Sequence, residues 1–350
     1  MKRHQTRSFH IGSVSVGGKA PISVQSMTKT DTRDVFATIH QIHELEEAGC
    51  DIVRVAVPDQ RAARGLETIR AGISIPLIAD IHFQHRLALM ALDAGIDGLR
   101  INPGNIGTER KVAEVVRKAA SLAVPIRIGV NAGSLEKDLL DKYGHPTPQA
   151  LVESALRHVR LLEKHDFHLI KISLKASDVF STVEAYRAIA AQTDYPLHLG
   201  ITEAGPSLRG IVKSVLGIGI LLAEGIGDTI RVSLTGPPLD EVKVGFAILQ
   251  SLKLRTVGPD IISCPTCGRC QIDMVPIVTE LERGLETVRK AVTVAVMGCV
   301  VNGPGEAREA DIGIACGKKS GLLFKKGQPV DRVSCNDFVD RLLEEVKNFQ

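Results

Sequence analysis

The feature that most constrains the fold of this chain is a regular alternation of short β-branched runs with longer segments of helical periodicity. Eight runs have the length and composition of strands: Ile22–Ser26, Ile52–Val57, Leu77–Ile81, Gly98–Asn102, Ile126–Val130, Leu169–Leu174, Leu197–Thr202 and Thr229–Leu234. Helical patterns separate or follow them: Asp34–Ala48, Gln60–Ala71, Phe83–Ala94, Lys111–Ser121, Pro148–Lys164, Val179–Ala191, Leu208–Ala223 and Asp240–Leu252. A spacing of about 30 residues is that of one βα unit. Eight such units predict an α/β fold, a closed (β/α)8 or TIM barrel.

Two further observations refine this prediction. No Gly-rich G-x-G-x-x-G turn follows the first strand, which weakens the alternative of a doubly wound sheet. The chain changes character after about residue 256, where six of its seven cysteines lie. Strands are expected there at Val292–Met297 and Ala310–Ala315, and helices at Pro276–Lys290 and Asn336–Lys347. We therefore predict a barrel domain over residues 1–256 and a smaller α+β domain over residues 257–350.

Composition narrows the function. The net charge is +3, Trp is absent and aromatic residues make up 3%, so neither a basic surface nor base-stacking platforms favour nucleic-acid binding. Met1–Gly18 lacks the apolar region of a signal peptide, and Ile211–Ala223 is too short to span a membrane. We expect a cytoplasmic protein without a membrane partner. Seven cysteines in that compartment indicate metal or redox chemistry before disulfides.

Charged residues occupy strand positions that a barrel normally fills with Val, Ile or Leu. The predicted substrate-binding set lies within the strands or at their ends: Arg54, Asp80, Arg100, Asn102, Arg127, Asn131, Lys171, Lys175 and Arg231. Asp80, Asp228 and Glu203 can neutralise only part of this positive charge. A bound polyanion is the simplest compensation, because Arg presents a fork of donors to phosphate oxygens. Each Arg paired with a neighbouring acid is the structural alternative. Glu203, among cations at a strand end, is the candidate catalytic acid or base.

The cysteines form a second constellation. Cys264-Pro-Thr-Cys267-Gly-Arg-Cys270 presents thiols from a tight turn, and Cys299 follows in Met297-Gly-Cys299-Val-Val-Asn-Gly-Pro-Gly-Glu306. Spacing alone leaves zinc and an iron–sulfur cluster open. Beyond the Cys264–Cys270 run, a second C-x2-C or an H-x3-H, which zinc would favour, is missing, and so is the downstream Cys-Pro of a bacterial ferredoxin. Three other cysteines, at positions 50, 316 and 335, are expected to be structural.

Several segments together resemble one known family. They are Pro21-Ile-Ser-Val-Gln-Ser-Met-Thr28, Arg100-Ile-Asn-Pro-Gly-Asn105, Arg127-Ile-Gly-Val-Asn-Ala-Gly-Ser134, Gly200-Ile-Thr-Glu-Ala-Gly205, Gly227-Asp-Thr-Ile-Arg-Val-Ser233, Cys264-Pro-Thr-Cys267-Gly-Arg269 and Gly298-Cys-Val-Val-Asn-Gly-Pro-Gly-Glu306-Ala. This set is similar to the bacterial 4-hydroxy-3-methylbut-2-enyl diphosphate synthases of the methylerythritol phosphate route to isoprenoids. The resemblance covers nearly the whole chain and matches the compact two-domain form.

The resemblance implies a specific chemistry. The substrate would be 2-C-methyl-D-erythritol 2,4-cyclodiphosphate, opened by two-electron reduction with loss of water to (E)-4-hydroxy-3-methylbut-2-enyl diphosphate. Electrons would come from flavodoxin or ferredoxin. A [4Fe–4S] cluster would be held in the C-terminal domain by Cys264, Cys267, Cys299 and Glu306, and Cys270 departs from the family pattern. The enzyme would be a homodimer in which each cluster domain covers the partner's barrel.

The same residues also fit other functions. The basic strand ends also resemble phosphate-binding aldolases, where Lys171 or Lys175 would form a Schiff base, and pterin-type synthases with a structural zinc site. A simple electron carrier does not need so large a barrel. A radical enzyme that uses S-adenosylmethionine wants a C-x3-C-x2-C near the first strand, and the sequence lacks it there.

Overall fold

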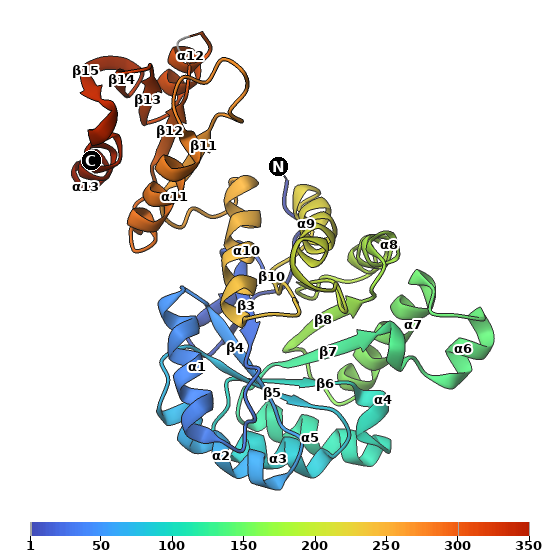
Figure 1. Ribbon diagram of the computed structural model, residues 1–350. Helices are drawn as coiled ribbons and strands as arrows, with labels where there is room; N and C mark the ends of the chain where they lie inside the picture. The colour runs from blue at the N-terminus through green and yellow to red at the C-terminus, as the bar shows by residue number, and fades with distance from the viewer. Residues whose placement is uncertain (1, 300, 350) are drawn as a thin grey trace. The chain divides into compact units, whose positions relative to one another are not determined.

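The computed structural model describes residues 2–299 and 301–349, and the chain forms two compact units, Met1–Arg255 and Thr256–Gln350 (Figure 1). In the first unit, eight parallel strands follow the order β8-β7-β6-β5-β4-β3-β10-β9. A bridge between Ile172 and Leu197 joins the two outer strands of this order. The sheet therefore closes on itself, and the predicted (β/α)8 barrel is confirmed.

The barrel strands are short and begin close to the predicted positions. They are β3 Ser23–Met27, β4 Ile52–Ala56, β5 Leu77–Ile81, β6 Gly98–Ile101, β7 Ile126–Asn131, β8 Ile170–Lys175, β9 His198–Leu199 and β10 Thr229–Ile230. The last two are shorter than expected. Beyond Leu199 the next residue is Gly200, which lacks the side chain that would pack on a strand.

Helices surround the barrel, as Figure 1 shows. They are α1 Val35–Glu47, α2 Gln60–Ala71, α3 His85–Asp93, α4 Pro103–Ile106, α5 Glu109–Ser121, α6 Lys137–Tyr143, α7 Pro148–Glu163, α8 Val179–Ala190, α9 Ser207–Ala223 and α10 Pro238–Ser251, with a 3-10 turn at Ala132–Ser134. Asp34, Asp59 and Asp178 each accept a hydrogen bond from a first-turn amide of the helix that follows. These caps satisfy amide donors at the helix starts. The short α4 and α6 were not predicted.

A small N-terminal hairpin closes one end of the barrel. Strands β1 Phe9–Ile11 and β2 Val14–Val16 pair antiparallel. Phe9, Ile11 and Val16 pack with the inward residues Ile52 and Ile78, near the starts of β4 and β5. The end at which the strands begin is therefore sealed by apolar side chains, and the opposite, carboxyl end is left for a site.

Asp228 belongs to the sealed side, contrary to expectation. Its Oδ1 accepts hydrogen bonds from Arg3 and from Thr6, each at 2.9 Å. Its Oδ2 accepts from the amide of Leu197, at 2.9 Å. Asp228 lies just before β10 and ties the N-terminal segment to the barrel, away from the mouth. Of the predicted barrel cations, it acts on the deep Lys171, where its charge opposes the lowering of the pKa that burial causes.

The second unit is built on a five-stranded mixed sheet, which confirms the smaller α+β domain. Its strands are β11 Asp260–Ser263, β12 Thr293–Met297, β13 Ile312–Cys316, β14 Ser320–Lys325 and β15 Gln328–Ser334. The first three are parallel and the last three antiparallel. The helices are α11 Met274–Leu285, α12 Gly303–Glu309 and α13 Phe338–Asn348, with a 3-10 turn at Cys335–Asp337. Three strands and α12 were not predicted, and α11 ends before Lys290.

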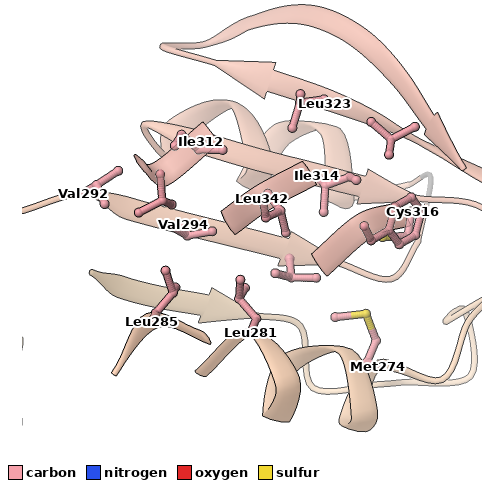
Figure 2. Close-up of a cluster of buried hydrophobic side chains, with 14 residues drawn as sticks. Met274, Leu281, Leu285, Val292, Val294, Ile312, Ile314, Cys316, Leu323 and Leu342 are labelled. Carbon is pink, nitrogen blue, oxygen red and sulfur yellow. The ribbon is translucent and has the colours of Figure 1, made fainter. Parts of the chain in front are cut away.

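Both faces of this sheet are apolar. Alternate residues such as Val294, Val296 and Ile314 pack in one cluster with residues of α11 and α13 (Figure 2). The intervening residues Ala295 and Met297 pack in a second cluster that includes Ala307 of α12. Because successive side chains of a strand point to opposite faces, the central strands β12 and β13 are buried on both faces, whereas the outer strands β11 and β15 are mostly exposed. In the described parts of both units, no helix is long and apolar enough to cross a membrane.

Candidate functional site

A row of charged residues crosses the inner face of the barrel. Asp80 of β5 is in register with Arg100 of β6, Arg100 with Arg127 of β7, and Arg127 with Lys171 of β8. Register partners on neighbouring strands share one face of a sheet. Arg54, two residues beyond the inward-facing Ile52, points the same way. Charge therefore replaces the usual apolar packing in this layer of the barrel.

All of these side chains except that of Lys171 open into a cavity of about 250 Å³ at the carboxyl ends of the strands. Its lining includes predicted residues from six strands or their ends: Arg54, Asp80, Arg100, Arg127, Asn131, Lys175 and Arg231. It also includes residues that were not predicted: Met27, His82, Ser173, Thr202 and Ser233. Met27 and Ser173 could have been found by following strand alternation, since each lies two residues from an inward polar side chain.

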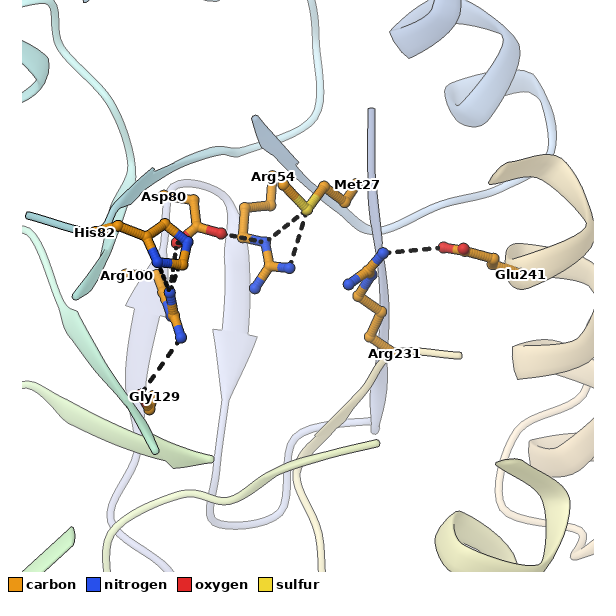
Figure 3. A network of polar contacts seen from close by, with 8 residues as sticks. All are labelled: Met27, Arg54, Asp80, His82, Arg100, Gly129, Arg231 and Glu241. Carbon is orange, nitrogen blue, oxygen red and sulfur yellow. Dashed lines mark hydrogen bonds and ion pairs between the residues drawn. The ribbon is translucent and has the colours of Figure 1, made fainter. Parts of the chain in front are cut away.

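Asp80 holds two of the arginines in place (Figure 3). Its Oδ1 accepts a hydrogen bond from Arg100 Nη1 at 3.0 Å, and its Oδ2 lies 3.5 Å from Arg54 Nε. Arg54 also directs Nε and Nη2 to the sulfur of Met27, at 3.3 and 3.0 Å. Burial alone would raise the pKa of Asp80, but the charges of Arg54 and Arg100 hold it well below its ordinary value. The carboxylate is therefore ionised and fixes both guanidinium groups.

The other buried cations have less compensation. Nε and Nη1 of Arg127 and Nζ of Lys171 have no hydrogen-bond partner within the described residues. Burial, and then the charge of Arg127, lowers the pKa of both Lys171 and Lys175 well below the ordinary value. Buried cationic groups without partners are costly, so an anionic ligand in this cavity would be strongly favoured.

Two glycines make room for these cations. A Cβ on Gly129 would lie 2.5 Å from Nε of Arg100, and a Cβ on Gly200 would lie 2.6 Å from Nζ of Lys175. Both distances are shorter than a van der Waals contact. The glycines of Arg127-Ile-Gly129 and Gly200-Ile therefore allow long side chains to cross the barrel interior at these points.

Arg231 is positioned from outside the sheet. Its Nη2 lies 3.5 Å from Oε2 of Glu241, in the first turn of α10 (Figure 3). Oε1 of the same carboxylate accepts from the amide of Leu234 at 3.0 Å and lies 3.0 Å from Nζ of Lys29. Sequence reasoning missed Glu241, because an acid in the first turn of a helix is common as a purely local feature.

Three predicted residues do not line the cavity. Lys171 lies deeper, two residues before Ser173 on β8, and its side chain is 1% exposed. Asn102 caps α4, where its Oδ1 accepts from the amide of Gly104 at 3.1 Å. Glu203 is exposed, with a backbone φ of 52° in the left-handed region. It directly follows Thr202, which does line the cavity, so its loop borders the site.

In the C-terminal unit, the predicted cluster ligands share one edge of the sheet. Cys264 follows β11 and Cys299 lies two residues after β12, and these are neighbouring parallel strands. The amide of Gly298 donates to Sγ of Cys264 at 3.3 Å. Glu306 lies in the first turn of α12, and Cys267 is an exposed thiol in the loop after Cys264. Parallel strands carry their ligands at this same carboxyl edge in other α/β sheets.

The environment of Cys299 favours a thiolate. Backbone N–H groups of Asn302, Val301 and Gly303 lower the pKa of the Cys299 thiol. Thiolates are the form that binds metal, so this residue suits an iron–sulfur or a zinc site. Within residues 2–299 and 301–349, no three Cys, His, Asp or Glu side chains converge as ligands of a single ion do. The donor set of three thiols and one carboxylate fits a cluster with one exchangeable position.

The remaining cysteines are placed differently. Cys270 is half-buried, and its Sγ lies against Gly298 and donates to the carbonyl of Ile272 at 3.2 Å. Cys316 is buried in the core of the sheet, where burial raises the pKa of its thiol to about 12. Burial likewise raises the pKa of Cys50 in the barrel to about 12. Cys50 and Cys316 are therefore protonated thiols inside cores.

Known proteins share this architecture. A chain described as dihydropteroate synthase from Yersinia pestis superposes with a TM-score of 0.50 and 11% identity, covering 70% of this chain and 98% of that one. At this identity the likeness shows the barrel fold alone. It does not support the alternative function of a pterin-type synthase.

Much closer relatives cover the whole chain. Proteins named 4-hydroxy-3-methylbut-2-en-1-yl diphosphate synthase (flavodoxin) are 61% identical in Geobacter sulfurreducens, over 98% of this chain and 97% of that protein. The relative from Thermodesulfovibrio yellowstonii is 58% identical over 99% of both chains. That from Clostridium tetani is 57% identical over 99% of this chain and all of its own.

Family models agree with these relatives. The GcpE TIM-barrel domain matches residues 6–246, and the GcpE protein C-terminal domain matches residues 260–348. The two models correspond to the barrel and to the unit that carries the cysteine edge. This chain therefore belongs to the GcpE family of 4-hydroxy-3-methylbut-2-en-1-yl diphosphate synthases.

Proposed function

We propose that this chain converts 2-C-methyl-D-erythritol 2,4-cyclodiphosphate to (E)-4-hydroxy-3-methylbut-2-enyl diphosphate. Two electrons and one proton are consumed, the bond between carbon and a ring phosphate oxygen breaks, and a hydroxyl leaves as water. The observation that carries the proposal is the row of buried cations that lack hydrogen-bond partners on the inner face of the barrel. Full-length relatives of this chain are named as the synthase that makes this product. A cyclic diphosphate supplies the negative charge that this cavity lacks.

The barrel residues bind and orient the diphosphate. Arg54 and Arg100, held by Asp80, present fixed guanidinium donors, and Arg127, Lys175 and Arg231 add charge around the cavity. Asn131 adds a polar group to the cavity, Asn102 holds the start of α4 at the end of β6, and Lys171 supports the charge from below. Since the oxygen that leaves carbon gains negative charge, these preorganised cations stabilise the transition state more than the ground state.

Glu203 is our candidate for the proton that the leaving hydroxyl requires. It is exposed at the border of the cavity and follows Thr202 of the lining. If it delivers this proton, Glu203→Gln should lower kcat much more than it raises KM, because the amide keeps the shape of the side chain and loses the acid. A raised KM with an unchanged kcat would assign Glu203 to binding instead.

Cys264, Cys267, Cys299 and Glu306 would hold a [4Fe–4S] cluster in the C-terminal unit. When bound, such a cluster supplies electrons one at a time and an iron that polarises an oxygen. A carboxylate is a harder ligand than a thiolate and exchanges more readily, so Glu306 would leave one iron accessible. The lowered pKa of Cys299 and the position of Cys264 and Cys299 after neighbouring parallel strands support this assignment.

Metal analysis tests the proposal directly. Protein purified without oxygen should be brown and contain about four irons per chain. It should consume the cyclodiphosphate when reduced flavodoxin or ferredoxin is present, and comparison of the two donors identifies the preferred one. A colourless zinc protein would overturn the cofactor. Glu306→Cys should keep the iron and its absorbance but lose turnover, and full activity there would refute the exchangeable ligand.

We further propose that the barrel unit binds substrate, the C-terminal unit carries the cluster, and the two halves of one site come from different subunits of a homodimer. Arg127→Ala removes a barrel cation, and Cys264→Ser removes a cluster ligand. Each variant alone should be inactive. Dimers reassembled from an equal mixture should recover about one quarter of the wild-type activity, because half of them are mixed and each has one intact site. No recovery would place both halves in one chain.

A further inference from the structure

An apolar hollow adjoins the cationic cavity and shares two residues with it. The hollow has a volume of about 320 Å³ and lies at the ends of β4 and β5 and the start of α3. Asp80 and His82 line both spaces. The rest of its wall is mainly apolar, with Ala56, Phe83 and Leu87 as principal members.

The wall that separates the cavity from the hollow has a charged side and an aromatic side. The carboxylate of Asp80 faces the cations, where Arg100 and Arg54 hold it. The side chain of His82 is half exposed, and its Nε2 lies 3.1 Å from Nη1 of Arg100. Its ring lies 5.9 Å from the ring of Phe83, centre to centre, at a tilt of 43°. His82 thus has the cationic cavity on one side and an aromatic ring on the other.

Phe83 is the least expected member of this wall. It is 70% exposed, although burial of a phenylalanine side chain is strongly favourable. Ala56 is also exposed, beside the buried Val57 and Leu87. Apolar side chains that line a pocket beside a few convergent polar groups are typical of ligand sites. The cyclodiphosphate is compact and polar, so it offers little apolar surface to this hollow.

We propose that the cavity and the hollow together bind a diphosphate ester with a branched hydrocarbon chain longer than that of the product. The diphosphate lies among the cations and the chain passes His82 to contact Phe83, Ala56 and Leu87. Such an ester lacks the ring that the enzyme opens, so it competes with the substrate. Allylic diphosphates that are built by extending five-carbon diphosphates have this chemistry. The inference rests on the proposed function, because it assigns the head group to the same cations.

Titration calorimetry with two ligands separates the contribution of the diphosphate group to affinity from that of the hydrocarbon chain. Methyl diphosphate carries the head group alone, and geranyl diphosphate adds a ten-carbon chain. Titrated into the full-length protein prepared without oxygen, geranyl diphosphate should bind at least about tenfold more tightly, since each methylene removed from water contributes about fourfold. Equal affinities would overturn the inference and leave the proposed function intact. Failure of both probes to bind would instead count against the cationic diphosphate site itself.

Variants of the hollow locate the chain. Phe83→Ser removes an exposed contact and Ala56→Leu fills the space, so each should reduce the advantage of geranyl over methyl diphosphate to about threefold or less. Phe180→Ser is the matched control, because Phe180 is 76% exposed on α8 and is not part of the hollow. It should keep the full advantage.

Two results would refute the assignment to the hollow. One is an unchanged advantage in both Phe83→Ser and Ala56→Leu. The other is a change of oligomeric state in Phe83→Ser, measured by light scattering at the concentration of the titration. That change would show that the hollow contacts a second copy of the chain and does not serve a hydrocarbon ligand.

Discussion

The two units bury their sheets in opposite ways. The central strands of the C-terminal unit have apolar side chains on both faces, and its candidate ligands lie beyond the carboxyl ends of β11 and β12, where Cys264 and the buried Cys299 border the core. The barrel places Arg100, Arg127 and Lys171 on the inner face itself. In the C-terminal unit, the strand residues that pack the core are different from the candidate ligands, which follow the strands. In the barrel, packing and function compete for the same strand positions, so a gain in one is expected to cost the other.

Replacement of Arg127 should give the largest effect and the clearest view of this competition. Arg127→Met removes a 3% exposed cation and leaves an apolar side chain of similar length. We expect kcat/KM to fall by at least about 100-fold, because charge stabilisation of the leaving oxygen is lost. The melting temperature should stay level or rise, because an isolated buried charge is removed. A fall of several degrees would show that the cation also stabilises the barrel.

The corresponding change in the C-terminal unit should behave in the opposite way. Leu342 of α13 is fully buried in the sheet core. Leu342→Ala should reduce the free energy of unfolding of that unit by about 2–4 kcal/mol, measured by hydrogen exchange of β13 amides in increasing urea. Activity per bound iron should remain close to that of the wild type. Loss of activity with the iron retained would contradict the separation of core and site.

A smaller effect is expected where the backbone makes space for a cation. Gly129→Ala places a Cβ 2.5 Å from Nε of Arg100 and should displace that guanidinium from the cavity. We expect KM for the cyclodiphosphate to rise about tenfold. Gly133→Ala is the matched control, because no atom lies within 4 Å of its added Cβ. Similar kinetics for the two variants would argue against a special role of the close approach.

The smallest effect is a fractional uptake of protons. Burial, followed by the charge of Arg127, lowers the pKa of Lys175. A bound diphosphate brings negative charge, which raises the pKa of Lys175. The affinity for the diphosphate is therefore highest below the pKa that Lys175 has in the free protein. It declines as the pH rises through the pKa that Lys175 has in the complex. Calorimetry in two buffers of different ionisation enthalpy should show about half a proton taken up near the free pKa. Lys175→Met should remove this uptake, and net proton release in the unaltered protein would contradict the sign.

Much of the barrel could be predicted because its signal is local. Ile52–Ala56 and Leu77–Ile81 are continuous apolar runs interrupted by one charge, and each is followed by a helix, the first of which is capped by Asp59. The short strands β1 and β2 were missed because three residues carry too little pattern. The strands β14 and β15 were missed because Gly, Lys and Pro mask their alternation.

The site was predictable to the extent that it lies on strands. Arg100 and Arg127 stand out because charge is rare between buried Ile and Leu residues. Glu241, on α10, and His82, in the loop after β5, have no such local contrast, since their roles arise only when distant segments meet. Lys171 was predicted to line the cavity but lies below it. The alternation of β8 shows that its side chain points into the barrel, but it does not show how deep the residue lies.

The N-terminal hairpin that seals the barrel also bears on how the chain folds. Arg3 and Thr6 bond to Asp228, more than 200 residues away along the sequence. During synthesis, Arg3 and Thr6 leave the ribosome long before β10, the last strand of the barrel, has been made. Their hydrogen bonds to Asp228 can therefore form only after most of the barrel has been synthesised. Contacts of such long range slow folding. The apolar Phe9, Ile11 and Val16 would meanwhile need cover, from the earlier strands or from a chaperone.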